Sequence, residues 1–481
     1  MTTSRATSRP ASGRGRAAGR DPRPAYECDA CGHQPPKWVG RCPECGEWGA
    51  VVESTLTGPT VSGRVVSSRA PAEPARPIAT ISAAPARARP TGVPELDRVL
   101  GGGLVPGAVV LLAGEPGVGK STLLLDVAQQ WAAGAGSPSL VVSGEESVSQ
   151  VRLRAERMGT LHDQLYLAAE NDLGAVLGHL DAVGPGLLVL DSVQTITTPG
   201  TEGVPGGVTQ VRAVTAALVS VAKERGIATV LVGHVTKDGQ VAGPRVLEHL
   251  VDVVLHFEGD KHSSLRMVRG VKNRFGTADE VGCFEMHEGG ITSLADPSGL
   301  FLTRSADPVP GTCVTVAMEG RRALVTEVQA LIGATVAGSP RRTVSGLDSA
   351  RLAMVLAVLQ RRTERLTLHD REVFAATVGG IRVVEPAADL AVALAVASGG
   401  LNLAIAPTLV AIGEVGLTGE VRRVAAVPRR LAEAARLGFR HALVPAGCGP
   451  TSSGVTPENM RVMEVTDVRS ALQCAARTSA E

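Results

Sequence analysis

The sequence predicts an α/β fold whose first large domain binds a nucleotide, and three observations support this prediction. Between residues 91 and 297, short apolar runs alternate with stretches of helical character, the pattern of a parallel sheet covered by helices. Within this region, Gly114 to Ser121 fits the phosphate-binding loop G-x-x-x-x-G-K-[ST]. A second alternating region begins near Gly311 and has no such loop. We therefore expect two α/β domains, at 91–297 and 298–481.

Composition bounds the class of protein. A chain of 481 residues is expected to form two or three domains. Hydrophobic residues make up 44% but aromatic residues only 2%, so the cores must consist of Leu, Val and Ala. The net charge of +1 gives no indication of a partner. No apolar run is long enough to span a bilayer, and the N-terminus lacks the apolar core of a secretory signal, so we expect a cytoplasmic protein with no membrane partner.

Three segments precede the first large domain. Residues 1–24 are rich in Arg, Ser, Ala and Gly without periodicity, and we expect them to be disordered. This basic tail is open to two interpretations, a nucleic-acid contact or a solvated tail. Residues 25–50 form a compact cysteine cluster, and residues 51–90 have the Pro-, Ala- and Arg-rich composition of a linker.

The cysteine cluster predicts one structural zinc site. Two C-x-x-C knuckles are separated by ten residues, and each knuckle offers two thiolates to one tetrahedral ion. The alternative, two disulfides, fits poorly with a reducing compartment. A four-cysteine site has no open position, so we expect the zinc to be structural. The predicted ligands are Cys28, Cys31, Cys42 and Cys45.

Basic and aromatic residues decorate this module: Lys37, Trp38, Arg41 and Trp48. Such a surface can stack on single-stranded nucleic acid. The competing interpretation is that the tryptophans form the small core of the module, and we expect this for at least one of them.

The phosphate-binding loop has the flanking elements that the motif requires. Val109–Ala113 reads as a buried strand and Ser121–Trp131 as a helix. Backbone N–H groups of the loop would surround a polyphosphate at a helix N-terminus, Lys120 would contact the β- and γ-phosphates, and Ser121 would hold Mg²⁺. The predicted nucleotide-binding residues are Gly114, Glu115, Pro116, Gly117, Val118, Gly119, Lys120, Ser121 and Thr122.

Two acidic residues follow other predicted strands. Asp191 ends the apolar run Leu187–Leu190, the Walker B pattern, and would approach the Mg²⁺ ion. Glu145 follows the strand Leu140–Ser143 and has two interpretations, a general base for the attacking water or an acidic residue at an ordinary helix cap.

Cations and a histidine form a further group of candidates. His234 follows the strand Ala228–Val232 and either senses the γ-phosphate or is structural. Lys272 and Arg274 lie in the turn KNRFG. Cations supplied across a subunit boundary stabilise the charge of phosphoryl transfer, whereas the competing interpretation is a solvated basic turn.

Two long Gly-rich loops, Pro199–Thr209 and Asp238–Leu247, are candidates for a DNA path, although simple surface mobility also explains their composition. If these loops contact DNA, the residues expected to bind it are Gln210, Arg212, Lys237 and Arg245.

Several of these segments together resemble the RadA (Sms) family of bacterial DNA repair proteins. They are TGVPELDRVLGGGLVPG, GEPGVGKSTLL, SGEES, LVLDSVQT, LVGHVTKDG and VKNRFG, and the resemblance covers roughly residues 25–475. It implies a RecA-like ATPase core that uses ATP and Mg²⁺, with one structural Zn²⁺. It also implies a homo-hexameric, DNA-stimulated motor that moves on single-stranded DNA and drives branch migration of branched intermediates with the RecA recombinase. The implied catalytic residues are Lys120, Glu145, Asp191, Lys272 and Arg274.

The second α/β domain resembles the Lon protease domain but departs from its catalytic pattern. Lon-type proteolysis needs a Ser nucleophile and an activating Lys. Ala387 stands at the Ser position and Pro428 at the Lys position, so we expect an inactive scaffold. An ATP-dependent Lon-type peptidase is therefore disfavoured. A third alternative, a nucleotide-dependent regulatory ATPase of the circadian-clock type, predicts neither the zinc knuckle nor the Lon-like domain.

Overall fold

The computed structural model describes most of the chain in two compact units, residues 1–82 and 83–481. The predicted disordered tail, residues 1–24, lies outside the described residues. Among the described helices, none is both long enough and apolar enough to cross a membrane. The described residues are 25–54, 60–61, 64–65, 75–134, 136–234, 244–259, 263–303, 308–335, 339–363, 366–449, 457 and 459–478.

The first unit is built on one small antiparallel ribbon. Strands β1 (Ala25–Cys28) and β2 (Val51–Ser54) pair with Cys28 opposite Val51. The buried core consists of Cys28, Cys42 and Val51, against which Tyr26, Val39 and Ala50 pack. The linker contains a short antiparallel pair of two-residue strands, β3 (Thr60–Val61) and β4 (Arg64–Val65). A 3₁₀ turn follows at Ile78–Thr80.

The expectation that a tryptophan forms this core is wrong. Trp38 is 60% exposed and Trp48 75% exposed. The two buried cysteines and Val51 already fill the small interior, so the indole rings lie outside it. Trp38 Nε1 donates to the Val51 carbonyl at 3.1 Å, and the Arg41 guanidinium lies 5.9 Å from the ring centroid of Trp48.

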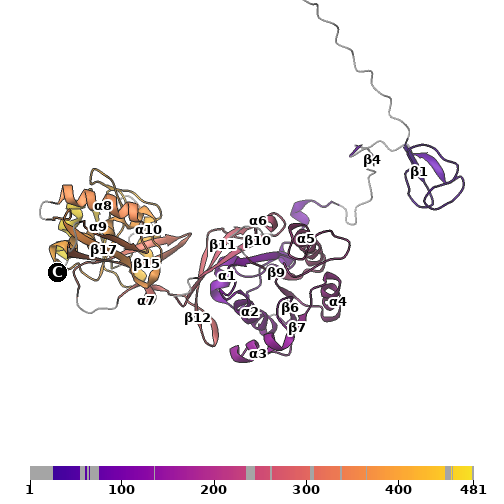
Figure 1. Ribbon diagram of the computed structural model, residues 1–481, viewed down its shortest axis with the longest axis horizontal. Helices are drawn as coiled ribbons and strands as arrows, with labels where there is room; N and C mark the ends of the chain where they lie inside the picture. The colour runs from indigo at the N-terminus through magenta and orange to yellow at the C-terminus, as the bar shows by residue number, and fades with distance from the viewer. Residues whose placement is uncertain are drawn as a thin grey trace, which may run out of the picture. The chain divides into compact units, whose positions relative to one another are not determined.

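The second unit begins with the predicted ATPase region, which forms a nine-stranded sheet in the order β13-β12-β11-β10-β5-β9-β8-β6-β7 (Figure 1). The strands from β10 to β7 in this order run parallel, and β11 to β13 extend the sheet antiparallel. The bounds are β5 Val109–Gly114, β6 Ser139–Ser143, β7 Leu165–Ala169, β8 Leu187–Asp191, β9 Ala228–His234, β10 Val253–Gly259, β11 Leu265–Asn273, β12 Val281–His287 and β13 Gly290–Ser293.

Helices cover both faces of this sheet because the central strands are apolar on both sides. Helices α1 (Pro94–Leu100), α2 (Lys120–Gly134) and α3 (Val148–Met158) bury their apolar residues on one face. On the other face lie α4 (Leu173–Val183), α5 (Val208–Arg225) and α6 (Pro244–Leu247). The predicted α/β architecture is confirmed.

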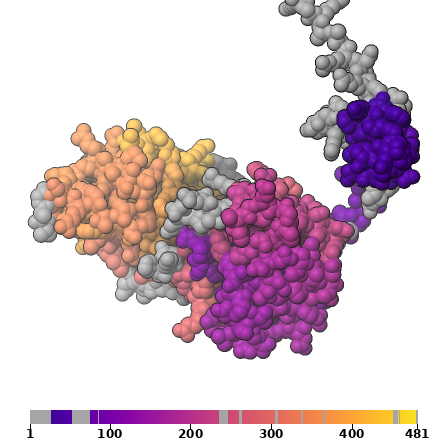
Figure 2. Space-filling view, turned by 45° about the vertical axis from the view of Figure 1, so that its right-hand side comes forward, coloured from indigo at the N-terminus to yellow at the C-terminus, as the bar shows by residue number. Residues whose placement is uncertain are grey.

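The C-terminal part of the unit is a second α/β domain, drawn in orange and yellow in Figure 2. Its seven-stranded sheet has the order β16-β17-β15-β14-β18-β21-β22. Helices α8, α9 and α12 pack on one face, and α10 packs on the other. The bounds are α7 Ser298–Phe301, β14 Thr312–Glu319, β15 Arg322–Ala334, β16 Arg342–Ser345, α8 Ser349–Arg362, β17 Arg371–Thr377, α9 Asp389–Leu401, β18 Leu409–Ala411, β19 Glu414–Val415, β20 Val421–Arg422, α10 Val427–Arg436, β21 His441–Pro445, β22 Arg461–Val465 and α12 Val468–Thr478.

The sequence GGIRVVEP, residues 379–386, predicts a strand and a turn before a helix at Ala387–Ala397, and this strand is misplaced. The segment 379–386 contributes only an isolated bridge between Val383 and Leu347, and the strand lies upstream as β17. Gly379 and Gly380 both have φ of +73°, a left-handed conformation that ends the strand. A 3₁₀ turn then begins at Pro386.

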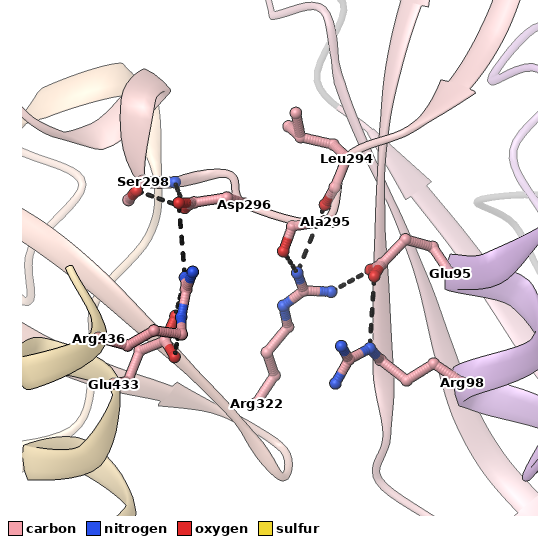
Figure 3. A network of polar contacts seen from close by, with 9 residues as sticks. All are labelled: Glu95, Arg98, Leu294, Ala295, Asp296, Ser298, Arg322, Glu433 and Arg436. Atoms are coloured by element: carbon pink, nitrogen blue, oxygen red, sulfur yellow. Dashed lines mark hydrogen bonds and ion pairs between the residues drawn. The ribbon is translucent and has the colours of Figure 1, made fainter.

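A buried ion pair joins the ATPase domain to the C-terminal domain (Figure 3). Arg322, the first residue of β15, pairs with Glu95 of α1, and their side chains are only 7% and 3% exposed. Glu95 Oε2 also accepts from the Cys283 backbone N–H at 2.9 Å, and Arg322 donates to the Ala295 carbonyl at 2.8 Å. Both charges therefore have further hydrogen-bond partners, as a buried pair requires.

Candidate nucleotide site and zinc centre

The phosphate-binding loop connects β5 to α2 and depends on close packing that only glycine permits. Gly117 and Gly119 have φ of +77° and +113°. A Cβ atom on Gly119 would lie 2.3 Å from Cε of Met286, and one on Gly114 would lie 2.5 Å from the Phe257 carbonyl oxygen. Strands β10 and β12 therefore pack directly against the loop. With no side chains at these glycines, the backbone N–H groups of the loop are the groups available to bind phosphate.

Lys120 is the first residue of α2 and is 3% exposed. Its ammonium donates to the carbonyl oxygens of Gly114 at 3.0 Å and Glu115 at 2.8 Å. Burial lowers the pKa of Lys120, whereas the carboxylates of Asp191 and Glu145 act in the opposite direction. The positive charge is thus held at the loop, close to two carboxylates from other strands.

Parallel pairing brings the ends of the central strands to one edge of the sheet. Gly114 lies opposite His234, and Ser143 lies opposite Asp191. Burial raises the pKa of Asp191, and Glu145 adds to that rise, while a hydrogen bond with the Ser121 side chain lowers it. Ser121 and Asp191 therefore present two neighbouring oxygen groups, the ligand type that Mg²⁺ prefers.

Glu145 is held by two side chains from neighbouring strand ends. The Ser192 hydroxyl donates to Glu145 Oε1 at 2.6 Å, and His234 Nε2 lies 2.8 Å from the same oxygen. Burial raises the pKa of Glu145, but the Ser192 hydrogen bond and the His234 and Lys120 interactions outweigh it, so the pKa is lowered. Ser192 was not among the residues predicted from the sequence. Its position directly after Asp191, at the end of a predicted strand, could have indicated that it lies at the nucleotide site.

The neighbouring acid has a different environment. Glu146 pairs with Arg154 of α3. The cap of α3 is formed by Ser147, whose side chain accepts from the Gln150 N–H in a reciprocal capping box. Glu145 takes no part in this cap, so of its two interpretations the geometry favours the one in which the carboxylate faces the nucleotide site.

Two buried polar atoms beside Glu145 have no hydrogen-bond partner among the described residues. They are His234 Nδ1 and Gln194 Oε1. Gln194 is 9% exposed, and its Nε2 donates to the His234 carbonyl at 3.5 Å. Gln194 was also missed by the sequence prediction. His234 ends β9 and Gln194 lies in the turn after β8, so the contact between them links the chain after β8 to the end of β9.

The KNRFG turn lies at the opposite end of β5 from Lys120. Arg274 Nη1 lies 3.1 Å from Asp252 Oδ1, while Asp252 Oδ2 accepts from the N–H of Val109, the first residue of β5. Lys272 Nζ donates to the carbonyls that precede Asp252, those of Glu248 and Val251, at 2.5 and 2.8 Å. Six residues of strand, about 17 Å, thus separate this turn from the phosphate loop of the same chain. The structure does not bring Lys272 and Arg274 together with Lys120, Glu145 and Asp191.

The predicted DNA contacts fall into different environments. Gln210 is 4% exposed in the first turn of α5, where its amide donates to the Thr201 carbonyl at 2.6 Å and accepts from the Thr198 N–H at 3.1 Å. The buried Gln210 side chain stabilises the backbone of the preceding loop. A direct contact of Gln210 with DNA stays a prediction. Arg212 is exposed on the same helix. Lys237 lies outside the described residues, and Arg245 lies in α6 with its side chain outside them.

The four predicted zinc ligands converge in the first unit. Their sulfur atoms all lie within 4.8 Å of one another. Each knuckle closes in the same way, with Gly32 N–H donating to the Cys28 carbonyl and Gly46 N–H to the Cys42 carbonyl. Both glycines have positive φ, +73° and +76°. Four sulfurs in this arrangement fit a closed tetrahedral zinc site and leave no position for a substrate.

The positions expected to carry a Lon-type dyad hold no nucleophile or base. Ala387 is 2% exposed in the 3₁₀ turn Pro386–Ala388. Pro428 lies in the first turn of α10. On either side of Ala387, Glu385 binds Arg430 at 2.6 and 2.7 Å, and Asp389 binds Arg351 Nε at 2.9 Å. Ion pairs that stabilise the domain thus surround the position of the missing nucleophile.

Comparisons with known proteins agree with this organisation. Residues 74–240 match the family described as an AAA domain, and residues 26–53 match the rubredoxin metal binding domain. The chain is 57% identical to the DNA repair protein RadA of Mycolicibacterium smegmatis over 95% of this chain and 97% of that protein. It is 55% identical to RadA of Mycobacterium tuberculosis over 94% and 93%. It is 43% identical to RadA of Streptococcus pyogenes over 93% and 98%.

Proposed function

The chain belongs to the RadA family of DNA repair proteins, with an ATPase domain and a zinc ribbon, and on this premise we propose that it is a DNA-dependent motor. It translocates on single-stranded DNA and promotes branch migration of recombination intermediates together with the RecA recombinase. The observation that carries the proposal is the fixed position of Glu145, between Ser192 and His234 at the nucleotide edge of the sheet.

This geometry supports hydrolysis in which Glu145 accepts a proton from the attacking water. A carboxylate with a lowered pKa is ionised at neutral pH, as a proton acceptor must be, and the two contacts on Oε1 fix its direction. Lys120 would move from the loop carbonyls to the phosphates. Ser121 and Asp191 would hold Mg²⁺, which when bound supplies charge neutralisation at the phosphates.

The same geometry supports a coupling between nucleotide and DNA. His234 is the last residue of β9, and the predicted DNA loop 238–247 follows it in the chain. A change in the contact between His234 and Glu145 on hydrolysis would therefore act directly on this loop. Exposed Arg212 next to the first loop, and the exposed Trp48 and Arg41 in the zinc ribbon, offer charge and stacking surface for single-stranded DNA.

In a homo-hexamer, the KNRFG turn of one subunit would supply a cation to the nucleotide site of its neighbour. Arg274 is 51% exposed and lies at the far end of β5 from its own Lys120, so it is available to the nucleotide site of a neighbouring subunit. A cation that reaches the γ-phosphate only in the assembled ring would make hydrolysis depend on assembly.

The decisive experiment measures ATP turnover with and without single-stranded DNA, and strand exchange on a branched substrate with and without RecA. We expect DNA to raise turnover and the protein to extend branches that RecA has begun. Turnover that does not respond to DNA would favour the regulatory ATPase instead. Digestion of casein would favour the peptidase, which Ala387 and Pro428 oppose.

A further inference from the structure

Asp252 is a buried carboxylate to which the proposed mechanism gives no role. It lies directly before β10 and is 4% exposed. Its two oxygens have different partners. Oδ2 accepts from the Val109 N–H at 3.1 Å, and Oδ1 lies 3.1 Å from Nη1 of Arg274 and 3.9 Å from Nζ of Lys223. One side chain thus connects the start of the phosphate-loop strand to the KNRFG turn.

The backbone of Asp252 makes the same connection. Its N–H donates to the Val109 carbonyl at 2.9 Å, and its carbonyl accepts from the Arg274 N–H at 3.2 Å. Asn273 adds a further anchor by donating to the Leu100 carbonyl at 3.1 Å. The base of the turn is therefore fixed on both sides, whereas the Arg274 side chain, which is half exposed, is held through Asp252 Oδ1.

Both predicted DNA loops lead into helices whose C-terminal ends lie near Asp252 or Lys272. Helix α5 begins at Val208, at the end of the predicted loop 199–209, and its last turn carries Lys223, whose Nζ lies 3.9 Å from Asp252 Oδ1. Helix α6 forms the last four residues of the second predicted loop, 238–247, and the carbonyls of Glu248 and Val251 just after it bind Lys272. A displacement of either helix would therefore change the surroundings of Asp252 or of Lys272.

We propose that Asp252 is a positioning residue for Arg274. Its charge holds the guanidinium at a set place relative to β5, so that Arg274 reaches the neighbouring subunit's nucleotide only when α5 and α6 are in the DNA-bound arrangement. Because a guanidinium has five N–H donors in a rigid fork, one side can bind Asp252 while the other remains available to a phosphate. The inference rests on the proposed role of Arg274 across a subunit boundary.

The test is a double-mutant cycle of Asp252→Asn and Arg274→Ala. Asparagine keeps an oxygen for the Val109 N–H but removes the charge that holds Arg274. We expect Asp252→Asn to bind a fluorescent ATP analogue within twofold of the parent protein, while DNA-stimulated turnover falls at least fivefold. The double variant should be no slower than Arg274→Ala, because Asp252 acts through Arg274. The matched control is Asp181→Asn, which removes an exposed partner of Arg225 at the end of the same helix α5.

Two results would mean that Asp252 acts on its own phosphate loop through Val109. In the first, the fold losses of turnover in the two single variants multiply in the double variant. In the second, ATP binding by Asp252→Asn weakens as much as its turnover falls. Either result overturns the inference. If Arg274→Ala itself leaves DNA-stimulated turnover intact, it is the proposed function that fails. Should Asp252→Asn lose its cooperative unfolding transition, Asp252→Glu keeps the charge but displaces it by one methylene. It is expected to lower DNA-stimulated turnover with ATP binding unchanged, and the reverse pattern counts against the inference.

Discussion

Glu145 Oε1 lies 2.8 Å from His234 Nε2, although the two residues are 89 positions apart in the chain. Glu145 follows β6 and His234 ends β9, and between them in the sheet stands β8, after which Ser192 donates to the same oxygen. Three neighbouring parallel strands therefore contribute one residue each to the position of this carboxylate. Such an arrangement orients a base before the substrate arrives, which reduces the cost of reorganisation during reaction.

Glu145→Gln should retain ATP binding and lose hydrolysis. The amide keeps the size of the side chain and can still contact Ser192 and His234, but it cannot take a proton. Loss of a general base typically lowers turnover by roughly 10²- to 10⁴-fold. Turnover and analogue binding measured on the same preparation check this. Glu146→Gln is the matched control, because the adjacent carboxylate pairs with Arg154. Equal loss in both variants would refute a specific role for Glu145.

Lys120→Ala should abolish hydrolysis without unfolding the domain. Removal of a charge-assisted contact to the β- and γ-phosphates is expected to cost on the order of 2–4 kcal/mol in transition-state stabilisation, roughly 30- to 1000-fold in rate. The two loop carbonyls that now accept from the ammonium, those of Gly114 and Glu115, face the loop and can be solvated. Turnover is compared with the thermal unfolding transition, and a variant that hydrolyses ATP at the parental rate would remove this loop from the catalytic site.

The central strands could be predicted from the sequence because they are buried on both faces. All six residues of β5 are buried, as are the first four of β8, and each gives a continuous apolar run. Strand β7 was missed because it stands at the edge of the sheet and mixes exposed, half-buried and buried residues. Because β7 has a neighbour on one side only, its residues do not form a continuous buried run, although the strand pairs in register with β6.

The sequence predicts only those residues of the nucleotide site that directly follow an apolar strand. Asp191, Glu145 and His234 follow apolar runs, and parallel strands bring such residues to one edge. The order of strands cannot be read from the sequence, so the contacts of Glu145 with both Ser192 and His234 could not be predicted. Side-chain direction was equally hidden. Gln210 reads as a polar residue beside a loop, but its amide points inward to the Thr198 and Thr201 backbone.

The zinc ribbon should hold one tightly bound Zn²⁺ per chain, and Cys28→Ser should release it. Cys28 is 1% exposed and forms part of the small core, so loss of the metal should unfold the first unit. Because residues 83–481 form a separate compact unit, the unfolding transition of the ATPase domain should not shift.

Elemental analysis and thermal unfolding check both statements. Cys474→Ser, a change outside the ribbon, is the control and should leave the metal content at one. A stable Cys28–Cys31 disulfide without metal in reduced protein would overturn the assignment.

Arg322→Met should destabilise the second unit by about 3–5 kcal/mol, because it removes the buried partner of Glu95 and leaves only the half-exposed Arg98 as its counter-charge. The double variant Glu95→Leu/Arg322→Met removes both charges and should recover much of this loss. Urea unfolding of the three proteins measures the difference. A single variant as stable as the parent would mean that Arg98, which lies 3.3 Å from Glu95, compensates the charge by itself.

Subunit mixing tests whether the nucleotide site is completed between subunits. Lys120→Ala removes a contact within the phosphate loop, and Arg274→Ala removes a cation at the far end of β5, so each protein alone should be inactive with DNA. In mixed rings, some interfaces pair an intact loop from one subunit with an intact Arg274 from its neighbour, and these should recover turnover. Activity should pass through a maximum as the mixing ratio changes, and co-purification of untagged Arg274→Ala protein with tagged Lys120→Ala protein should show that mixed rings have formed. If such rings form and no activity returns, Arg274 acts within its own chain. The KNRFG turn would then be a structural support of β5 through Asp252, which already connects the two.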